Sequence, residues 1–353
     1  MAGSPTTRTS SRWSSRGRQP ALNKTTESSI GPCVLGCGTI GDRTQDFLLL
    51  SLFGRRPDGV RQPHGRKEMG KVGRIRVVTD STADMEGETA DRLGIVVVPL
   101  NVHWNGDTYL DKVEITIDEF YRKLREEKGT PKTSQPSTGQ FEAVYRRLLK
   151  EAGAIVSLHI SGKLSGTFNS AQVAARNVAP DRIVVIDSLA TTFPLGSLAA
   201  RVAALAQQGA SLKECVALAE DLVPRIRIFA AVDTLEFLRR GGRIGRAQAF
   251  AGNLLSIKLI FQVLGGEVLP VDRVRTRAAA VKRLAEVVSN LGPVEEMAIV
   301  YGDDPQPAEV LRALVEQSYP GLQLTGGRIG PVLGTHTGPG VIGVCAILSN
   351  DRG

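Results

Sequence analysis

Short apolar runs alternate with amphipathic stretches from residue 75 to the carboxyl end of the chain. Runs of about four to eight residues rich in Val and Ile indicate buried strands, and apolar residues spaced three or four apart indicate helices. The predicted strands are 75–79, 95–100, 154–160, 182–186, 227–232, 259–264, 267–271, 297–301 and 341–348. The predicted helices run from an Asp80–Thr82 cap to residue 93 and over 117–127, 137–151, 168–177, 195–208, 212–222, 235–239, 277–289 and 307–317.

The order of these elements predicts an α/β protein with two domains. Strands and helices alternate through residue 222, which is typical of a parallel sheet covered by helices on both faces. Beyond Pro224 the pattern changes, and Gly265-Gly266 separates two apolar runs as in a hairpin. We therefore expect a parallel α/β/α domain at 71–222 and a smaller α/β domain with a mixed sheet at 223–353.

Residues 1–70 differ from the rest of the chain. They are rich in Ser, Thr, Arg, Gly and Pro, and they show no sustained helix or strand period, so this leader is predicted to be disordered. Regular pattern starts abruptly at Ile75, shortly after Met69. We expect the natural polypeptide to begin at Met69, with the preceding segment arising from a misplaced start; a targeting arm is the alternative.

Composition and charge exclude several classes of protein. The chain has 353 residues, 42% of them hydrophobic, 23% charged, within the range of globular proteins. No apolar run reaches the roughly 18 residues of a spanning helix, so at most transient membrane contact is expected. The net charge of +8 falls mainly on residues 1–70, which carry +6, so nucleic-acid binding is not indicated. Four cysteines fit neither a disulfide framework nor a zinc site, which predicts a reduced cytoplasmic protein without a metal.

Four polar segments lie where strands end or helices begin. Thr79–Thr82 follows the first strand, and the carboxyl ends of parallel strands are where open sheets bind ligands. Thr133–Gly139 holds four hydroxyls and an amide, a set of neutral donors suited to a carboxylate or phosphate. Ser161–Thr167 is a glycine-containing turn before a helix, where backbone amides can converge on a small anion. Helix capping alone also accounts for Asp80 and Ser137.

The fourth segment, 330–340, contains the histidine that is the strongest functional candidate. His336 is flanked by threonines and by glycines and prolines, so we expect it in a rigid loop facing a pocket. His103 is predicted in a strand-to-turn segment without polar neighbours, and His159 in an apolar strand as a packed residue.

The segment 238–246 concentrates four arginines around two turns. It is suited to a phosphate or an acidic partner, or it is a solvated helix end. The sequence lacks Gly-x-x-x-x-Gly-Lys-Ser/Thr, and the Gly-x-Gly-x-x-Gly that starts at Gly36 lies in the leader without a strand and helix around it. No nucleotide or other cofactor is therefore predicted.

Seven blocks in this order resemble the DegV family of lipid-binding proteins. They cover about residues 75 to 349: Val78–Asp84, Val97–Leu100, Thr133–Ser137, Leu164–Thr167, Asp233–Glu236, Gly241–Ile244 and Gly334–Gly340. The resemblance implies a carrier subunit of a two-component fatty acid kinase. In this role a long-chain fatty acid lies in a tunnel between the two domains, and a separate ATP-binding kinase subunit phosphorylates its carboxylate.

The matching motifs imply which residues hold the ligand. Thr133, Ser165 and His336 would hold the carboxylate, with Ser134 and Ser161 nearby. In such a carrier, Arg240, Arg243, Arg273 and Arg275 are better used to contact the partner or the acyl phosphate than to hold ATP.

The alternative is a serine hydrolase acting on acyl esters, with Ser165, His336 and Asp80 as its triad. The sequence lacks the Gly-x-Ser-x-Gly turn that many such enzymes use. We therefore predict a binding protein rather than an enzyme.

Overall fold

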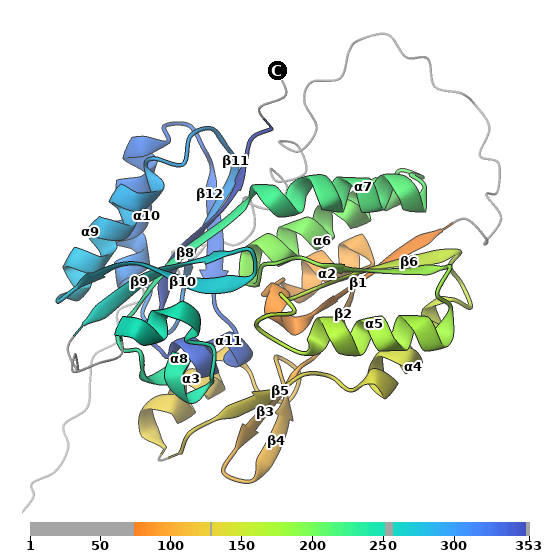
Figure 1. The fold of residues 1–353 in the computed structure, drawn as a ribbon, viewed down its shortest axis with the longest axis horizontal. Coiled ribbons are helices and arrows are strands. Elements are labelled where there is room, and N and C mark those ends of the chain that lie inside the picture. Colours follow the sequence, from red (N-terminus) through yellow and green to blue (C-terminus); the bar gives the residue numbers. More distant parts are fainter. Residues whose placement is uncertain (1–73, 128, 251–256, 351–353) are drawn as a thin grey trace, which may run out of the picture. The chain divides into compact units, whose positions relative to one another are not determined.

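The computed structural model describes residues 74–127, 129–250 and 257–350, and all of them belong to one compact unit. The predicted leader, with Met69 and Gly36, lies outside the described residues. The fold is α/β, as predicted, with one parallel sheet, one mixed sheet and one small antiparallel sheet (Figure 1).

The parallel sheet has the strand order β2-β1-β6-β7. Its strands are β1 (Ile75–Asp80), β2 (Val96–Val98), β6 (Ala154–His159) and β7 (Ile183–Asp187). Helices α2 (Gly87–Leu93), α6 (Thr192–Gln207) and α7 (Leu212–Leu222) lie on one face, and α4 (Thr138–Leu148) and α5 (Thr167–Val178) lie on the other (Figure 1). Alternate residues of β1 enter different cores, because successive side chains point to opposite faces of a sheet: Val77 packs with α6, and Val78 packs with α4.

The mixed sheet has the strand order β10-β9-β8-β13-β11-β12. Its strands are β8 (Ile226–Val232), β9 (Lys258–Leu264), β10 (Glu267–Val274), β11 (Val294–Tyr301), β12 (Leu324–Arg328) and β13 (Ile342–Leu348). Helices α9 (Arg277–Val288) and α10 (Gln306–Ser318) cover one face. The opposite face, which includes Ile228 and Ala230, shares a hydrophobic core with β1, β6 and α6. This shared core is where the pocket described below is found.

The small sheet was not predicted from the sequence. It consists of β3 (Asn101–Trp104), β4 (Asp107–Leu110) and β5 (Lys132–Ser134), and α3 (Ile117–Glu126) packs beside it. Its strands have three or four residues each, too few to establish an alternating pattern, and β5 is polar throughout. Thr133 and Ser134 therefore lie on a strand rather than in a loop.

Two further predictions of local structure were wrong. The helix expected from Asp80 to residue 93 is a short 3-10 turn, η1 (Ser81–Ala83), followed by α2, because Asp84 between them has a left-handed backbone with φ of 46°. The segment around His336 is not only a loop, since Pro331–Thr337 forms the short helix α11. Proline at the first helical position and Gly338 after the last are typical helix boundaries, so the signal was present in the sequence.

The two large sheets use separate parts of the chain. The parallel sheet comes from residues 75–187 and the mixed sheet from residues 226–348. A boundary between two domains at 222 and 223 stays a prediction, because the described residues form one compact unit. None of the helices within the described ranges is long and apolar enough to cross a membrane.

Candidate functional site

An apolar pocket lies where the carboxyl ends of the parallel strands meet the mixed sheet. It spans about 810 Å³ of space between protein atoms, part of which is open to solvent. Residues from β8, β9, β10 and β11 form the mixed-sheet side. The rest of the lining includes residues after β6, at the start of α6 and on α11, together with Thr133 of β5 and Arg243, which follows α8 (Glu236–Arg240).

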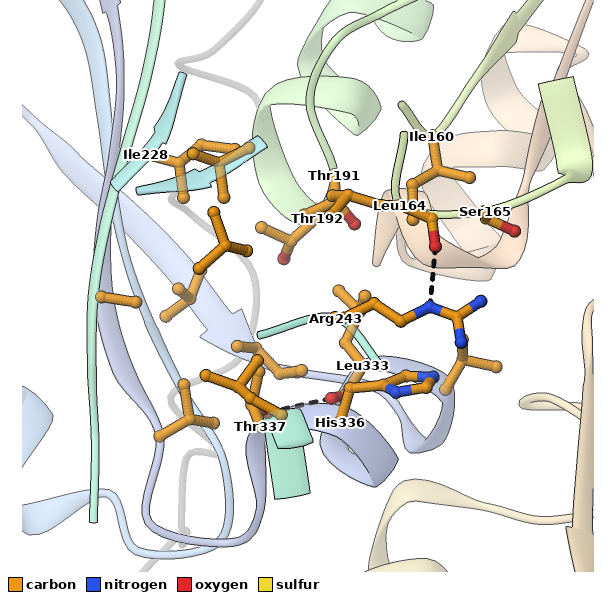
Figure 2. A pocket seen from close by; sticks show the side chains of 18 of the residues that line it. Ile160, Leu164, Ser165, Thr191, Thr192, Ile228, Arg243, Leu333, His336 and Thr337 are labelled. Carbon is orange, nitrogen blue, oxygen red and sulfur yellow. Dashed lines mark hydrogen bonds between the residues drawn. The ribbon is translucent and has the colours of Figure 1, made fainter. Parts of the chain in front are cut away.

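The walls of the pocket are mainly aliphatic, with a small polar part. The apolar lining includes Ile160, Leu164, Ile228, Ala230, Phe261, Val263, Val300, Ile329 and Leu333. The polar lining consists of Thr133, Ser165, Thr191, Thr192, Arg243, His336 and Thr337. Figure 2 shows Ser165, Arg243 and His336 well separated from Ile228 across the pocket. A ligand that fits this lining is a long apolar molecule with one polar end.

Thr133 and His336 form the central polar contact of the site. Thr133 Oγ1 and His336 Nε2 are 2.7 Å apart, although the residues are 203 positions apart in sequence. Thr133 is positioned by β5, which pairs with β3 through Val102. His336 is positioned by α11, which packs on α8 (Glu236–Arg240) and on α3. The sequence nominated both residues, and the fold brings them together.

The imidazole of His336 is neutral at pH 7. Burial, and to a smaller extent the positive charge of Arg243, lower the pKa of His336 to about 4. A neutral imidazole has one N–H donor and one acceptor nitrogen. When Nε2–H donates to Thr133 Oγ1, the hydroxyl hydrogen of Thr133 is free to donate to a ligand.

Gly241 sets the position of the His336 ring. A Cβ atom at Gly241 would lie 2.0 Å from His336 Nδ1, far inside van der Waals contact. Nδ1 itself is buried and has no hydrogen-bond partner among the described residues. The sequence pointed to the block around Gly241 but did not show why a glycine stands there. The structure shows that the His336 ring lies too close to Gly241 for a side chain at this position.

Arg243 supplies the positive charge at the polar side of the pocket. Its Nε donates to Leu164 O at 2.9 Å (Figure 2). Its Nη1 donates to Gly241 O. These two bonds fix the guanidinium between the loop after β6 and the segment after α8. Arginine has five N–H donors, so donors remain for an anion at this position.

The three predicted serines have different surroundings. Ser165 lines the pocket, and its Oγ lies 2.9 Å from Thr167 Oγ1. Ser161 is fully buried and donates to Gly266 O at 3.0 Å, which ties the loop after β6 to the β9–β10 turn. Ser134 Oγ contacts His103 Nε2 at 2.9 Å. Ser134 and Ser161 are therefore not part of the pocket lining, although both are next to residues that are.

The remaining predicted arginines lie outside the pocket lining. Arg240, at the end of α8, forms an ion pair with Glu236 and donates to Thr130 Oγ1. Arg273 is exposed on β10, and Arg275 is exposed just beyond it. Of the four arginines predicted to contact a partner or a phosphate, only Arg243 lines the pocket.

His103 was predicted wrongly. It was expected to lack polar neighbours, but its two ring nitrogens contact Thr108 Oγ1 and Ser134 Oγ, each at 2.9 Å. The cause is the unpredicted small sheet, in which β3 pairs with β4 on one side and with β5 on the other. A strand between two polar strands gives its histidine partners that linear sequence does not reveal.

Asp80 and His159 belong to a separate buried network. Asp80 Oδ2 is 2.9 Å from His159 Nδ1 and accepts from the backbone N–H of Ile160 at 3.0 Å. His159 Nε2 lies 2.7 Å from Ser157 Oγ, which in turn contacts the hydroxyl of Tyr145. The network joins the ends of β1 and β6 directly before the Ser161 loop, so it fixes where that loop begins.

This network leaves the serine hydrolase alternative unsupported. A triad aspartate would accept a hydrogen bond from the histidine that activates the serine. Asp80 instead pairs with His159, and Nδ1 of His336 has no hydrogen-bond partner within the described ranges. Ser165 Oγ contacts Thr167, so the structure does not assemble Ser165, His336 and Asp80 into a triad.

Sequence reasoning missed three hydroxyl residues that line the pocket: Thr191, Thr192 and Thr337. Thr192 Oγ1 donates to Asp84 Oδ2 at 2.8 Å, and Thr337 Oγ1 donates to Leu333 O at 2.9 Å. Thr191 Oγ1 is buried without a partner in the described part of the chain. The signal for Thr191 and Thr192 was their place after the strand 182–186, where ligand-binding residues of parallel sheets are found.

The described residues contain no group of three or more His, Cys, Asp or Glu side chains that could hold a metal ion. The fold and the pocket together define an α/β protein in which a parallel sheet and a mixed sheet meet at an apolar pocket with a small polar part.

Comparison with known proteins agrees with this class. A family model described as "Uncharacterised protein, DegV family" matches residues 74–349, and the chain belongs to the DegV family. A DegV domain-containing protein of Streptomyces coelicolor is 37% identical over 274 residues, covering 76% of this chain and 97% of the relative. The DegV protein of Bacillus subtilis is 33% identical over 275 residues, covering 77% and 98%.

Solved structures give the same family. A DegV family protein from Thermus thermophilus, described by its fatty acid binding, is 38% identical with a TM-score of 0.72, covering 78% of this chain and all of the other. DegV of Bacillus subtilis, described as a fatty acid binding protein, is 32% identical with a TM-score of 0.71, covering 78% and 99%. A stearic acid-binding protein from Eubacterium ventriosum is 29% identical with a TM-score of 0.72, covering 78% and 98%.

Proposed function

We propose that this protein binds a long-chain fatty acid in the apolar pocket and presents the carboxylate to a separate ATP-dependent kinase subunit. The observation that carries the proposal is the lining of the pocket: aliphatic walls with Thr133, Ser165, Arg243 and His336 among the few polar residues. The structural relatives described as fatty-acid-binding proteins support the same ligand class.

The aliphatic walls provide affinity, and the polar residues orient the ligand. Each methylene of an acyl chain contributes about 0.8 kcal/mol on burial. A carboxylate is costly to bury unless donors receive it, and the hydroxyls of Thr133 and Ser165 can do so. Arg243 adds a positive charge beside them, while the low pKa of His336 keeps its imidazole neutral. The carboxylate is then held without a deep, fully buried ion pair, and its oxygen stays able to react.

The reaction that follows is phosphoryl transfer by the partner. A carboxylate oxygen forms a bond to the γ-phosphorus of ATP, the bond from that phosphorus to the bridging oxygen breaks, and ADP leaves. The products are an acyl phosphate and ADP. We assign ATP and its magnesium to the partner because this chain lacks a phosphate-binding loop of the Gly-x-x-x-x-Gly-Lys-Ser/Thr type. Arg240, Arg273 and Arg275 are exposed or half-exposed and are proposed to contact that partner or the acyl phosphate.

Mass spectrometry of a solvent extract of the purified protein tests ligand binding. We expect about one fatty acid per protein. Thr133→Val and Ser165→Ala are expected to weaken stearate binding by about tenfold or more, as for loss of a hydrogen bond to a charged group. Thr337→Val is the matched control, because its hydroxyl also lines the pocket but is bonded within α11. A protein that binds no fatty acid would refute the proposal.

The presentation role has its own test. The lipid-loaded protein is incubated with ATP and magnesium, with and without an ATP-binding fatty acid kinase subunit, and acyl phosphate is trapped with hydroxylamine. We expect product only when the subunit is present. Equal production by this protein alone would show that it is itself the enzyme, whereas tight fatty acid binding without product in either case would limit it to binding.

A further inference from the structure

Thr191 lines the pocket with a hydroxyl group that the protein does not satisfy. The residue is 8% exposed, and its Oγ1 is buried with no hydrogen-bond partner among the described residues. Figure 2 shows Thr191 on the pocket wall together with Thr192 and Leu164. A buried hydroxyl without a partner is costly, and native proteins rarely leave one unless a ligand or water completes it.

The local sequence removes one of the two usual partners of this hydroxyl. Thr191 is the N-cap residue of α6, and N-cap threonines normally accept from the N–H of the second or third helical residue. The third residue here is Pro194, which has no N–H, and the Thr191 side chain does not accept from the remaining candidate, Phe193, because it makes no cap hydrogen bond. The hydroxyl is therefore left over at the amino end of a sixteen-residue helix that begins on the pocket wall.

The backbone around Thr191 is held in this position from both sides. Leu189 and Thr192 have left-handed backbones, with φ of 50° and 53°, which are unfavourable for residues other than glycine. The carbonyl of Ala190 accepts from the N–H of Ser161, and Thr192 Oγ1 donates to Asp84. Strained backbone that is fixed by neighbouring bonds keeps Thr191 on the pocket wall.

We infer that Thr191 is a specificity residue for an oxygen atom on the acyl chain. The ligand class is a fatty acid carrying a hydroxyl or oxo group, whose oxygen accepts from Thr191 Oγ1–H while the carboxylate occupies the site at Thr133 and His336. This inference rests on the proposed fatty acid binding and names a narrower ligand class. Thr191 differs in this from the other pocket threonines, since Thr192 and Thr337 already donate to protein oxygens.

Binding of stearate and a panel of monohydroxylated octadecanoic acids, with the hydroxyl at successive chain positions, tests the inference. A hydroxyl that meets Thr191 gains a hydrogen bond, and one that meets aliphatic wall is desolvated without a partner, so the panel contains its own negative controls. We expect the wild-type protein to prefer one position, or two adjacent positions, over the other isomers by about tenfold. Thr191→Val should abolish that preference, Thr191→Ser should retain it, and Thr337→Val should leave it unchanged.

The outcomes separate this inference from the proposed function. Stearate binding with no preferred hydroxyl position, or a preference that survives in Thr191→Val, would overturn the role of Thr191 and leave fatty acid binding intact. A loss of stearate affinity in Thr191→Val as large as in Thr133→Val would also overturn it, because the hydroxyl would then hold the carboxylate. Absence of any stearate binding in the wild-type protein would overturn both.

Discussion

The wild-type protein is expected to lose stability as the pH rises, because the buried carboxyl group of Asp111 becomes charged. Replacing Asp111 with Asn should remove this loss. Asp111 follows β4 and is 2% exposed. Neither of its carboxylate oxygens makes a hydrogen bond of good geometry in the described structure, and the side chain of Ser81 and the backbone of Val332 give it only weak support. Burial raises the pKa of Asp111 from 3.8 to about 6, and the positive charge of Lys112 opposes this rise. The protonated form of Asp111 is therefore favoured in the folded protein.

The sign and size of the effect follow from proton linkage. Between pH 3.8 and about 6 the folded protein holds the Asp111 proton more tightly than the unfolded chain does. The stabilisation is present below this interval and is lost as the pH rises through it. At about 1.4 kcal/mol per pKa unit, the loss is ~3 kcal/mol in the free energy of unfolding, with about half of it falling above pH 5.

Urea unfolding of the wild-type protein and of Asp111→Asn between pH 5 and 7.5 measures this difference. From pH 5 to 7.5 the free energy of unfolding of the variant should rise by about 1.4 kcal/mol relative to that of the wild type. A constant difference in stability caused by the amide itself does not affect this pH-dependent change. Asp107→Asn is the matched control, because Asp107 is an exposed carboxylate on the same strand. Parallel stability curves for the wild type and Asp111→Asn would refute the reasoning that Asp111 is buried without adequate partners.

Two further predictions concern the pocket and the buried charges. Gly241→Ala should weaken stearate binding by about tenfold or more at nearly unchanged melting temperature, because its Cβ would push the His336 ring away from Thr133 and so misplace the Thr133 hydroxyl that is proposed to donate to the carboxylate. Gly327→Ala, with no atom within 4 Å of its Cβ, is the control, and equal affinity in both variants would contradict the role of Gly241. Arg201→Met should lower the free energy of unfolding by about 3–5 kcal/mol, because it leaves Glu296, 7% exposed and 2.6 Å from Arg201, as an unpaired buried charge. Urea unfolding measures this loss, and the double variant with Glu296→Met should recover most of it. A change below about 1 kcal/mol in Arg201→Met would contradict the prediction.

The larger elements of this fold could be predicted from the sequence because their patterns are local. Strand β6 is a mainly apolar run, and α7 has clear apolar spacing, so each was predicted within one or two residues of its observed bounds. The parallel arrangement followed from the alternation of such elements. Thr133, Ser165 and His336 were also nominated from the sequence, because each lies in a segment that matches a motif of the DegV family.

The short elements required the tertiary structure. β3, β4 and β5 have three or four residues each, and their pairing depends on chain segments that meet only after folding. Their absence from the prediction is why His103 was expected to lack polar neighbours, and why Thr133 was assigned to a loop. A strand stabilised by its neighbours rather than by its own apolar pattern leaves little signal in the sequence.

The sequence by itself determined which residue types are available to this pocket, and the tertiary structure decided which of them face it. Ser161 and Ser165 lie in the same seven-residue turn, yet Ser165 lines the pocket and Ser161 is used to bind Gly266. Among the predicted arginines, Arg243 reaches the pocket and Arg240 pairs with Glu236. The physical reason is that a hydroxyl or a guanidinium bonds to whichever partner packing brings within about 3 Å, and that partner is set by the three-dimensional fold rather than by sequence neighbours.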